Sequence, residues 1–404
     1  MLTNKRTLNL FTDIKNEGAY NLMKTQLYEW HSKNGDMINF AGFQMPVMYS
    51  SIKQEHLAVR NSAGLFDVSH MGRMWIKGKH SEKFLNLLVP RDLNKTVVGK
   101  ASYTFMLNER GGFRDDLVFE RIDSDVWLLV WNAGNLAKIR DWMITLKTMI
   151  EQFTDLNLTF ENISDSSAMF ALQGPKAQEI GKAILPNENE PPRPWNILQT
   201  KIDDIDLIIS GTGYTGEAGY EIIVLNTSSD HPSNAEKIWN LILKTGKPYG
   251  LLPCGLGARD SLRLEAGLAL YGNDIDEFKN PIEAGLFFPP FVHMDKPYFI
   301  GKNKLEHLNQ EKNMVRVGFK ALKKGPSPRP DVKLFKDNKE IGYATSGGFS
   351  PLLNIGIGMG YVPVELKDEG NIIEFEVRGK YHKAKIVKFP LFDSTKYGSK
   401  RNQS

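Results

Sequence analysis

A chain of 404 residues is too long for one ordinary hydrophobic core and predicts two or three domains. Its 41% hydrophobic and 24% charged residues are typical of a globular protein, and its net charge of +4 includes no basic run of the kind that grips nucleic acid. The single cysteine, Cys254, excludes an internal disulfide framework and a cysteine-rich metal site. Its apolar surroundings, LLPCGLG, predict a small buried side chain.

Two features of the sequence bear on where the protein resides. No run of about 18 apolar residues is present, so we expect no membrane span. The N-terminal segment MLTNKRTLNLFTDIKNEG lacks the apolar core of a signal peptide, and its Asp13 and Glu17 argue against a transit peptide. We therefore expect a cytoplasmic protein in which residues 1–20 form a flexible extension.

Apolar residues recur at helical spacing along much of the chain up to residue 311. Residues 280–297, NPIEAGLFFPPFVHMDKP, are loop-like and predict a crossing between domains. The expected helices lie at 19–33, 52–61, 80–89, 134–152, 175–184, 234–245, 258–270 and 302–311.

The character of the chain changes at Val315. Six short β patterns follow, separated by turn residues: VRVGFKA, DVKLFKD, IGYATSG, IGIGMGYV, NIIEFEVRG and HKAKIVKF. Six strands within so short a stretch predict a small antiparallel barrel or sandwich.

Residues 111–132, GGFRDDLVFERIDSDVWLLVWN, predict a β-hairpin that carries two adjacent carboxylates. Side chains alternate along a strand, so Asp115 and Asp116 face opposite sides. Asp116 shares its side with Arg114, whereas Asp115 has no cation two residues away. Asp115 is therefore the stronger candidate for a reactive carboxylate, against the alternative that both acids line a solvated strand end.

His70 in the segment AGLFDVSHMG invites a catalytic or metal-binding interpretation. No second histidine lies near it at the spacing of a metal ligand, which favours a structural role.

Gly211, Gly213 and Gly216 match the GxGxxG pattern of a dinucleotide-binding turn. That turn precedes a helix, whereas the segment that follows here, GYEIIV, predicts a strand. We therefore expect a glycine-rich hairpin that allows close approach of a ligand or another backbone. Tyr214 and Glu221 on this hairpin could stack on and hydrogen-bond to a flat heterocycle, or could be an exposed tyrosine and a strand-face acid.

The helix expected at 258–270 carries Arg259 and Arg263 one turn apart. Asp260 and Arg263 have the spacing of a surface ion pair. Arg259 lies in the first turn, where the helix dipole disfavours a cation, and so predicts a specific partner.

Together these segments resemble the aminomethyltransferase of the glycine cleavage system, the T-protein family. The matching motifs run in family order from about residue 25 to 395: FAGFQMPVMY, GLFDVSHMG, GGFRDDLV, GTGYTGEAGYEI, GLGARDSLRLEAGLALYGNDID, TSGGFSP and MGYVP. The resemblance implies an α+β fold, a three-domain cloverleaf with two interwoven folate-binding domains over residues 21–300 and a C-terminal antiparallel β-barrel over 312–395.

The resemblance also implies a reaction. An aminomethyl group on the lipoyl arm of the H-protein passes to tetrahydrofolate, giving 5,10-methylenetetrahydrofolate and ammonia, with no metal. It assigns Asp115 to the essential aspartate, Glu221 to the residue that grips the donor-rich pterin edge, and Arg259 to a ligand contact. Further contacts implied for the ligand are Met71, Tyr103, Asn132, Tyr214 and Tyr397.

Other functions remain open on the same scaffold. They include the folate domains of sarcosine and dimethylglycine dehydrogenases, a sulfoniopropionate demethylase, a non-catalytic folate-binding helper for iron–sulfur maturation, and a binding module without turnover. No flavin fingerprint is present, and the lysine-glycine-cysteine-tyrosine segment of the helper proteins is missing from the sequence. The residues of the motifs GGFRDD and GYTGEAGYE favour the aminomethyltransferase of the glycine cleavage system.

Overall fold

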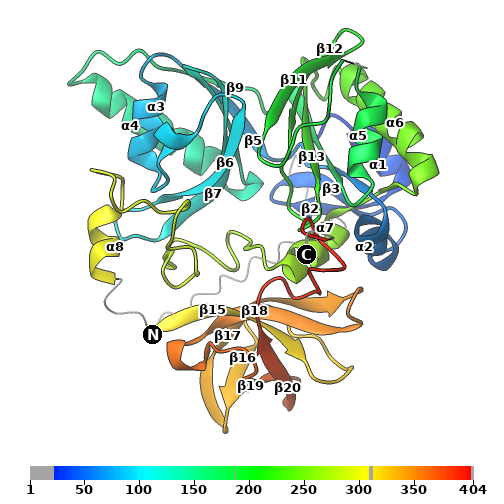
Figure 1. Cartoon of the computed structure of the whole chain (residues 1–404), viewed down its shortest axis with the longest axis vertical. Helices are drawn as coiled ribbons and strands as arrows, with labels where there is room; N and C mark the ends of the chain where they lie inside the picture. The colour runs from blue at the N-terminus through cyan, green and yellow to red at the C-terminus, as the bar shows by residue number, and fades with distance from the viewer. Residues whose placement is uncertain (1–21, 187, 309–312, 402–404) are drawn as a thin grey trace.

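The computed structural model describes residues 22–186, 188–308 and 313–401 (Figure 1). Two α+β units lie side by side above a β-barrel, which is the predicted fold class. The N-terminal extension expected at 1–20 lies outside the described residues.

The first α+β unit is built on a six-stranded sheet whose strand order is β11-β12-β13-β10-β4-β14. Helices α5 (Ala177–Ile184) and α6 (Ser233–Gly246) cover its outer face, where Ile180 and Trp239 pack against Phe170. The strands are β4 (Gly64–Asp67), β10 (Ser167–Gln173), β11 (Ile197–Ile202), β12 (Ile205–Ser210), β13 (Gly219–Leu225) and β14 (Leu252–Pro253).

A small sheet and two helices complete this unit. Its strand order is β1-β3-β2, with β1 (Met23–Lys24), β2 (Asp36–Phe40) and β3 (Phe43–Met48). Helix α1 (Tyr28–Asn34) begins well after residue 19, because Met23–Lys24 pair with β3 as a strand. Helix α2 (Ile52–Asn61) has the predicted bounds, and the Ser51 side chain accepts a hydrogen bond from the Gln54 N–H as its N-cap.

The second α+β unit has a five-stranded sheet with the order β6-β7-β8-β5-β9. Its outer face packs against α3 (Ser81–Leu88) and α4 (Leu136–Glu151) through Phe84 and Ile139. The predicted hairpin is present as β7 and β8. The strands are β5 (Gly72–Lys77), β6 (Lys100–Leu107), β7 (Phe113–Asp123), β8 (Val126–Trp131) and β9 (Thr159–Asn162).

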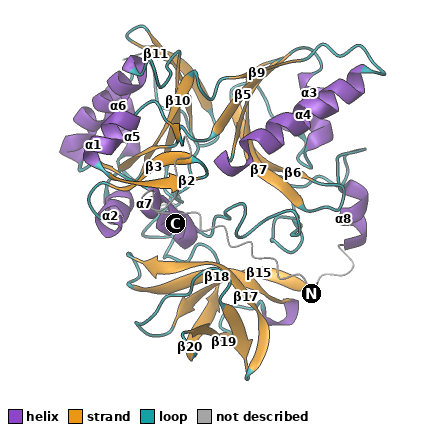
Figure 2. Cartoon of the chain, turned by 180° about the vertical axis from the view of Figure 1, so that it is seen from behind, coloured by secondary structure: helices purple, strands orange, loops and turns teal. Residues whose placement is uncertain are grey.

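The inner faces of the two sheets pack against each other. Leu128 and Val130 of the second sheet join Phe66, Met169 and Ile223 of the first in one buried apolar cluster. Both sheets therefore carry helices on the outside and meet in the middle, as Figure 2 shows from behind.

Six strands close the C-terminal barrel, as the six β patterns predict. The barrel strands are β15 (Met314–Ala321), β16 (Lys333–Lys336), β17 (Lys339–Ser350), β18 (Ile355–Pro363), β19 (Ile372–Val377) and β20 (Lys380–Val387). Helix α8 (Lys302–Leu308) precedes the barrel.

Helix α7 (Leu256–Ala266) joins the first unit to the barrel, packing on α2 and on β17 and β18. The predicted helix ran to Leu270, but Gly267 ends it in a left-handed conformation with φ of 76°. A Cβ at Gly267 would lie 2.2 Å from the Phe389 ring, so the stop also serves the packing of the barrel on the helix.

Cys254 is 1% exposed, as predicted for a small buried side chain. Within the described ranges, none of the helices combines the length and apolar character needed to cross a bilayer.

Candidate active site

A cavity of about 360 Å³ lies where the three units meet. It falls in the size range of small-molecule sites. Strands β7 and β8 form one wall, the loop before β13 and the ends of α7 form another, and Arg316 reaches it from the barrel.

Two adjacent carboxylates of β7 meet at one amide. Asn132 Nδ2 donates to Asp115 Oδ1 and to Asp116 Oδ1, both at 2.8 Å. Asp115 also accepts from Asn135 Nδ2 at 2.7 Å, and Asp116 accepts from the Tyr103 hydroxyl at 3.1 Å. Strand β6, the end of β8 and the start of α4 thus supply the donors that hold the pair.

Asp116 lines the cavity, whereas Asp115 does not. This differs from the sequence-based choice of Asp115. The face of β7 that carries Asp115, Leu117 and Phe119 packs towards α3 and α4, so its carboxylate is buried behind the cavity wall. Arg114, which the alternation placed on the side of Asp116, does not pair with it. Its guanidinium carbon lies 4.0 Å from the centre of the Trp142 ring instead.

The two acids change each other's protonation. Burial raises the pKa of Asp115, and the neighbouring Asp116 carboxylate raises it further. Burial also raises the pKa of Asp116, although the Tyr103 and Asn132 hydrogen bonds oppose that shift. Two carboxylates that share one donor do not both ionise easily, so the pair is suited to holding and releasing one proton.

The glycine-rich segment is a hairpin loop between β12 and β13, as expected. A Cβ at Gly213 would lie 2.0 Å from Gln173 Oε1, and Gly216 has a φ of 79°. Gln173 holds the loop by donating to the Thr212 carbonyl at 3.1 Å and accepting from the Thr215 hydroxyl at 2.8 Å. The glycines therefore let the loop lie directly on the buried Gln173 amide.

This loop and the following strand bring Tyr214 and Glu221 to the cavity wall. Thr212 Oγ1 donates to Glu221 Oε2 at 2.6 Å, which orients the carboxylate, and the Tyr214 hydroxyl donates to the Ala269 carbonyl at 2.5 Å. Both side chains are thereby held in place from the protein side.

Arg259 lines the same wall from the first turn of α7, and its guanidinium lies 4.7 Å from the centre of the Tyr214 ring. Its buried Nη1 has no hydrogen-bond partner among the described residues, and burial lowers the pKa of this guanidinium. Buried donors are normally paired, so Arg259 presents a donor suited to a ligand acceptor. Asp260 and Arg263 also pair, with Arg263 Nε 2.8 Å from Asp260 Oδ1, but Arg263 is buried and the pair is not the surface ion pair that the spacing predicted.

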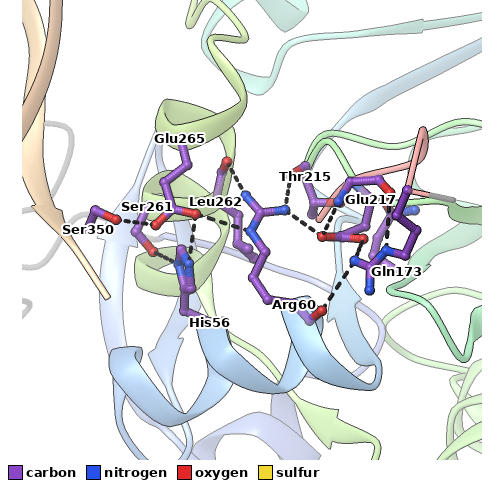
Figure 3. A network of polar contacts seen from close by, with 11 residues as sticks. His56, Arg60, Gln173, Thr215, Glu217, Ser261, Leu262, Glu265 and Ser350 are labelled. Carbon is purple, nitrogen blue, oxygen red and sulfur yellow. Dashed lines mark hydrogen bonds and ion pairs between the residues drawn. The ribbon is translucent and has the colours of Figure 1, made fainter. Parts of the chain in front are cut away.

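A buried polar network holds the Tyr214 loop from behind (Figure 3). Arg60 of α2 donates from Nε to Glu265 Oε2 at 3.1 Å and from Nη1 to Glu217 Oε1 at 3.0 Å. Nη1 also donates to the Thr215 carbonyl at 2.9 Å, and His56 Nε2 lies 3.0 Å from Glu265 Oε2. The network therefore ties the loop to both α2 and α7.

The structure brings six of the predicted site residues to one cavity and leaves two outside it. Asp115 lies behind the wall, and Tyr397 lies on the C-terminal segment, near Arg401, without lining the cavity. The six that line it are Met71, Tyr103, Asn132, Tyr214, Glu221 and Arg259.

Three of the wall residues that sequence reasoning missed carry polar or aromatic groups suited to a ligand. Asp116 was visible as half of the acid pair, and His70 was treated as structural. His70 lines the cavity, its buried Nδ1 has no partner in the described part of the chain, and burial together with Arg259 lowers its pKa to about 3. Trp195 belongs to the stretch 187–195 of the sequence, for which the family motifs offer no counterpart.

The described residues contain no group of three or more histidine, cysteine or acidic side chains that could hold a metal ion. A cavity with one member of a proton-sharing carboxylate pair on one wall, and a carboxylate and a guanidinium on the other, is suited to an enzyme that orients a flat polar ligand and moves protons on it.

Comparison with known proteins places this enzyme class in a family. Residues 27–296 match the family described as the GCVT N-terminal domain, and residues 315–393 match the glycine cleavage T-protein C-terminal barrel domain. The chain belongs to the glycine cleavage T-protein family of aminomethyltransferases.

Individual relatives cover nearly the whole chain. An aminomethyltransferase of Thermosipho melanesiensis is 45% identical over 91% of this chain and 96% of its own length. A probable aminomethyltransferase of Pyrococcus horikoshii is 40% identical over 93% of this chain and 98% of its own. The solved glycine cleavage aminomethyltransferase T of Bartonella henselae superposes with a TM-score of 0.80 at 34% identity, covering 92% and 98% of the two chains.

Proposed function

We propose that this protein transfers the one-carbon unit of an aminomethyl group, carried on the lipoyl arm of an H-protein, to tetrahydrofolate. The products are 5,10-methylenetetrahydrofolate, ammonia and the dihydrolipoyl carrier. Family membership supports the reaction class, and the cavity supports the acceptor. A cytoplasmic location is part of the proposal, in keeping with a chain whose one cysteine is buried and free.

The cavity walls offer groups that fit a reduced pterin. The Glu221 carboxylate is oriented by Thr212 and can accept two parallel N–H donors from the edge of the ring. The unpaired Nη1 of Arg259 can donate to a ring carbonyl. Complementary donors and acceptors on one wall would orient the pterin and leave its reactive nitrogens to face another part of the cavity.

The chemistry needs a proton acceptor near the reacting carbon. A folate nitrogen attacks the methylene carbon and the carbon–sulfur bond breaks with its electron pair on sulfur. The second folate nitrogen then displaces ammonia, and the two folate protons leave with sulfur and ammonia. A carboxylate at the wall can accept the first of these protons and stabilise positive charge on the carbon.

Asp116 is the carboxylate that we assign to this role, and Asp115 is its positioning partner. The single observation that carries the assignment is that Asp116, held by Tyr103 and Asn132, lines the cavity. Asp115 would act through the shared Asn132 amide and by raising the pKa of the pair.

The test has two stages, both under anaerobic reducing conditions. Calorimetric titration of tetrahydrofolate should show saturable one-to-one binding, and aminomethylated H-protein should then give methylenetetrahydrofolate in a single turnover. Asp116→Asn should slow transfer by about 10²–10⁴-fold but keep binding, while Asp123→Asn, at the exposed end of the same strand, should behave as wild type. Folate binding without transfer from aminomethylated H-protein would favour a demethylase or a binding helper instead.

A further inference from the structure

Lys138 is a cation in an unfavourable place on its helix. It lies in the first turn of α4, where the free N–H groups and the helix dipole disfavour positive charge. That turn contains no acidic side chain to offset the charge. Because the Lys138 side chain is only 29% exposed, water compensates in part. A lysine in this position predicts a specific anionic neighbour.

The acid pair of Asp115 and Asp116 lies on the side of α4 that carries Lys138. Asn135 precedes Lys138 by three residues and donates from Nδ2 to Asp115 Oδ1 at 2.7 Å. Residues three apart on a helix lie on the same face. The face of α4 that contacts Asp115 is therefore also the face of Lys138.

The Lys138 ammonium is held towards the strand that carries the acids. Nζ donates to the Tyr271 hydroxyl at 2.7 Å, and this hydroxyl donates to the Phe113 carbonyl at 3.2 Å. Nζ also lies 4.4 Å from the centre of the Tyr271 ring. Phe113 begins β7, two residues before Asp115. Tyr271 thus fixes the ammonium at the end of β7 where the acid pair lies.

A surface acid meets Lys138 from the other side but interacts with it weakly. Glu277 Oε1 lies 3.4 Å from Nζ, and the Glu277 side chain is 47% exposed. Solvent screens a pair of this kind, whereas a charge acts more strongly on a buried neighbour. Glu277 therefore leaves the ammonium able to act on Asp115.

The mutual effects on ionisation agree with this geometry. Burial and the Asp116 carboxylate raise the pKa of Asp115, and the two asparagine amides and the Lys138 ammonium oppose that shift. Burial lowers the pKa of Lys138, and the carboxylates of Glu277 and Asp115 oppose that shift in turn.

Other charged or titratable groups face the acid pair from the elements packed around it. They are Arg114 on β7, Tyr103 on β6, Lys138 on α4, and Tyr271, Asp274 and Glu277 in the segment after α7. Of the two cations in this set, Arg114 stacks on Trp142. Lys138 is the one whose charge acts on Asp115.

We propose that Lys138 is a positioning residue of the acid pair, whose ammonium keeps the pair ionised at neutral pH and so leaves Asp116 able to accept a proton. The consequence for transfer rests on the proposed function. The ionisation of the pair does not, and it can be measured in the protein without any substrate.

The experiment is an infrared pH titration of the full chain, which follows the C=O stretch of protonated carboxyl groups. The bands of the pair are assigned by their loss in Asp115→Asn and Asp116→Asn. Lys138→Gln removes the charge but keeps a donor for the Tyr271 hydroxyl. Its titration midpoint should lie about one pH unit above that of wild type, the lower end of the effect of a nearby cation, because the ammonium is partly exposed.

The rate of single-turnover transfer should show the same displacement. Its rising limb should move towards alkaline pH in Lys138→Gln, while the dissociation constant of tetrahydrofolate stays at the wild-type value. A merely structural lysine would change that constant or the folding of the protein and leave the limb in place.

Two variants serve as controls. Lys138→Arg keeps the charge and should restore the wild-type midpoint. Lys147→Gln removes a lysine that pairs with Glu151 about 13 Å further along α4, and it should leave the midpoint unmoved.

An unmoved midpoint in Lys138→Gln would overturn the inference and leave the proposed function standing, as would an equal displacement in Lys138→Arg or Lys147→Gln. If the midpoint moves as expected but the wild-type protein transfers nothing from aminomethylated H-protein, the proposed function fails while the control of the acid pair by Lys138 stands.

Discussion

Arg60→Met is the sharpest test of how the protein holds its candidate site. The Arg60 side chain is fully buried and donates to Glu265, Glu217 and the carbonyls of Thr215 and Leu262. Methionine fills a similar length of apolar space but leaves two buried carboxylates without their shared cation.

The expected loss in the free energy of unfolding depends on the partners that Glu265 and Glu217 keep in the variant. Removing one partner of a buried ion pair costs about 3–5 kcal/mol. Here Glu265 keeps His56 and Glu217 keeps Arg401, so some compensation survives. We therefore expect the lower end of that range, a loss of about 3 kcal/mol in the free energy of unfolding.

The assay is urea unfolding followed by tryptophan fluorescence and circular dichroism, with the shift in midpoint converted through the shared slope. Arg140→Met is the matched control, because Arg140 pairs with Asp141 on the surface at 2.8 Å and its loss should cost less than about 1 kcal/mol. A midpoint for Arg60→Met equal to that of wild type, or an equal loss in both variants, would refute the reasoning.

Four further predictions concern the cavity. Asp116→Asn should lower the transfer rate by about 10²–10⁴-fold, and a smaller loss in single-turnover kinetics would remove it from proton transfer. Because burial and the neighbouring charge raise the pKa values of the acid pair, the rate should increase with pH along a limb centred well above the ordinary aspartate pKa of about 3.9. Asp115→Asn should move that limb towards acid, and an unmoved pH profile would contradict the coupling. Arg259→Met should weaken tetrahydrofolate binding by about tenfold or more while leaving the protein as stable or more so, since no carboxylate of the described residues lies within ion-pair distance of its buried guanidinium; a less stable variant in the urea assay would show that the attraction of Glu221 already stabilises Arg259. Below pH 6.5 an unfolded His70 gains a proton that the folded one, with its pKa of about 3, does not, so the free energy of unfolding should fall by about 2 kcal/mol between pH 6.5 and 5, and His70→Phe should remove that part of the decline in thermal melts.

Much of the fold follows from local patterns in the sequence. The bounds of α2, the hairpin of β7 and β8, and the six barrel strands could be read from apolar period and turn residues, because these features depend on residues a few positions apart. The glycine-rich loop could be predicted in the same way. A dinucleotide-binding turn is followed by a helix, whereas the residues after Gly216 predict a strand.

The candidate site depended on packing that no local pattern contains. Alternation along β7 showed that Asp115 and Asp116 face opposite sides, but only the docking of α3 and α4 decided which side is covered by helices and which lines the cavity. Tyr397 was assigned from the loosely matching C-terminal stretch FPLFDSTKYG, yet it lies away from the cavity, because the C-terminal segment folds against the Glu217 loop, where the Gly398 N–H donates to Glu217.

What the sequence determined by itself is the family, the elements and the residue types that the chemistry needs. The tertiary structure decided which of them meet. Trp195 shows the difference most clearly: its place on the wall comes from hydrogen bonds to Ala101 of β6 and to Gly211 just after β12, which belong to different units and are far apart in the chain. Contacts of that range are set by how the sheets pack, and the spacing of residues in the sequence carries no record of them.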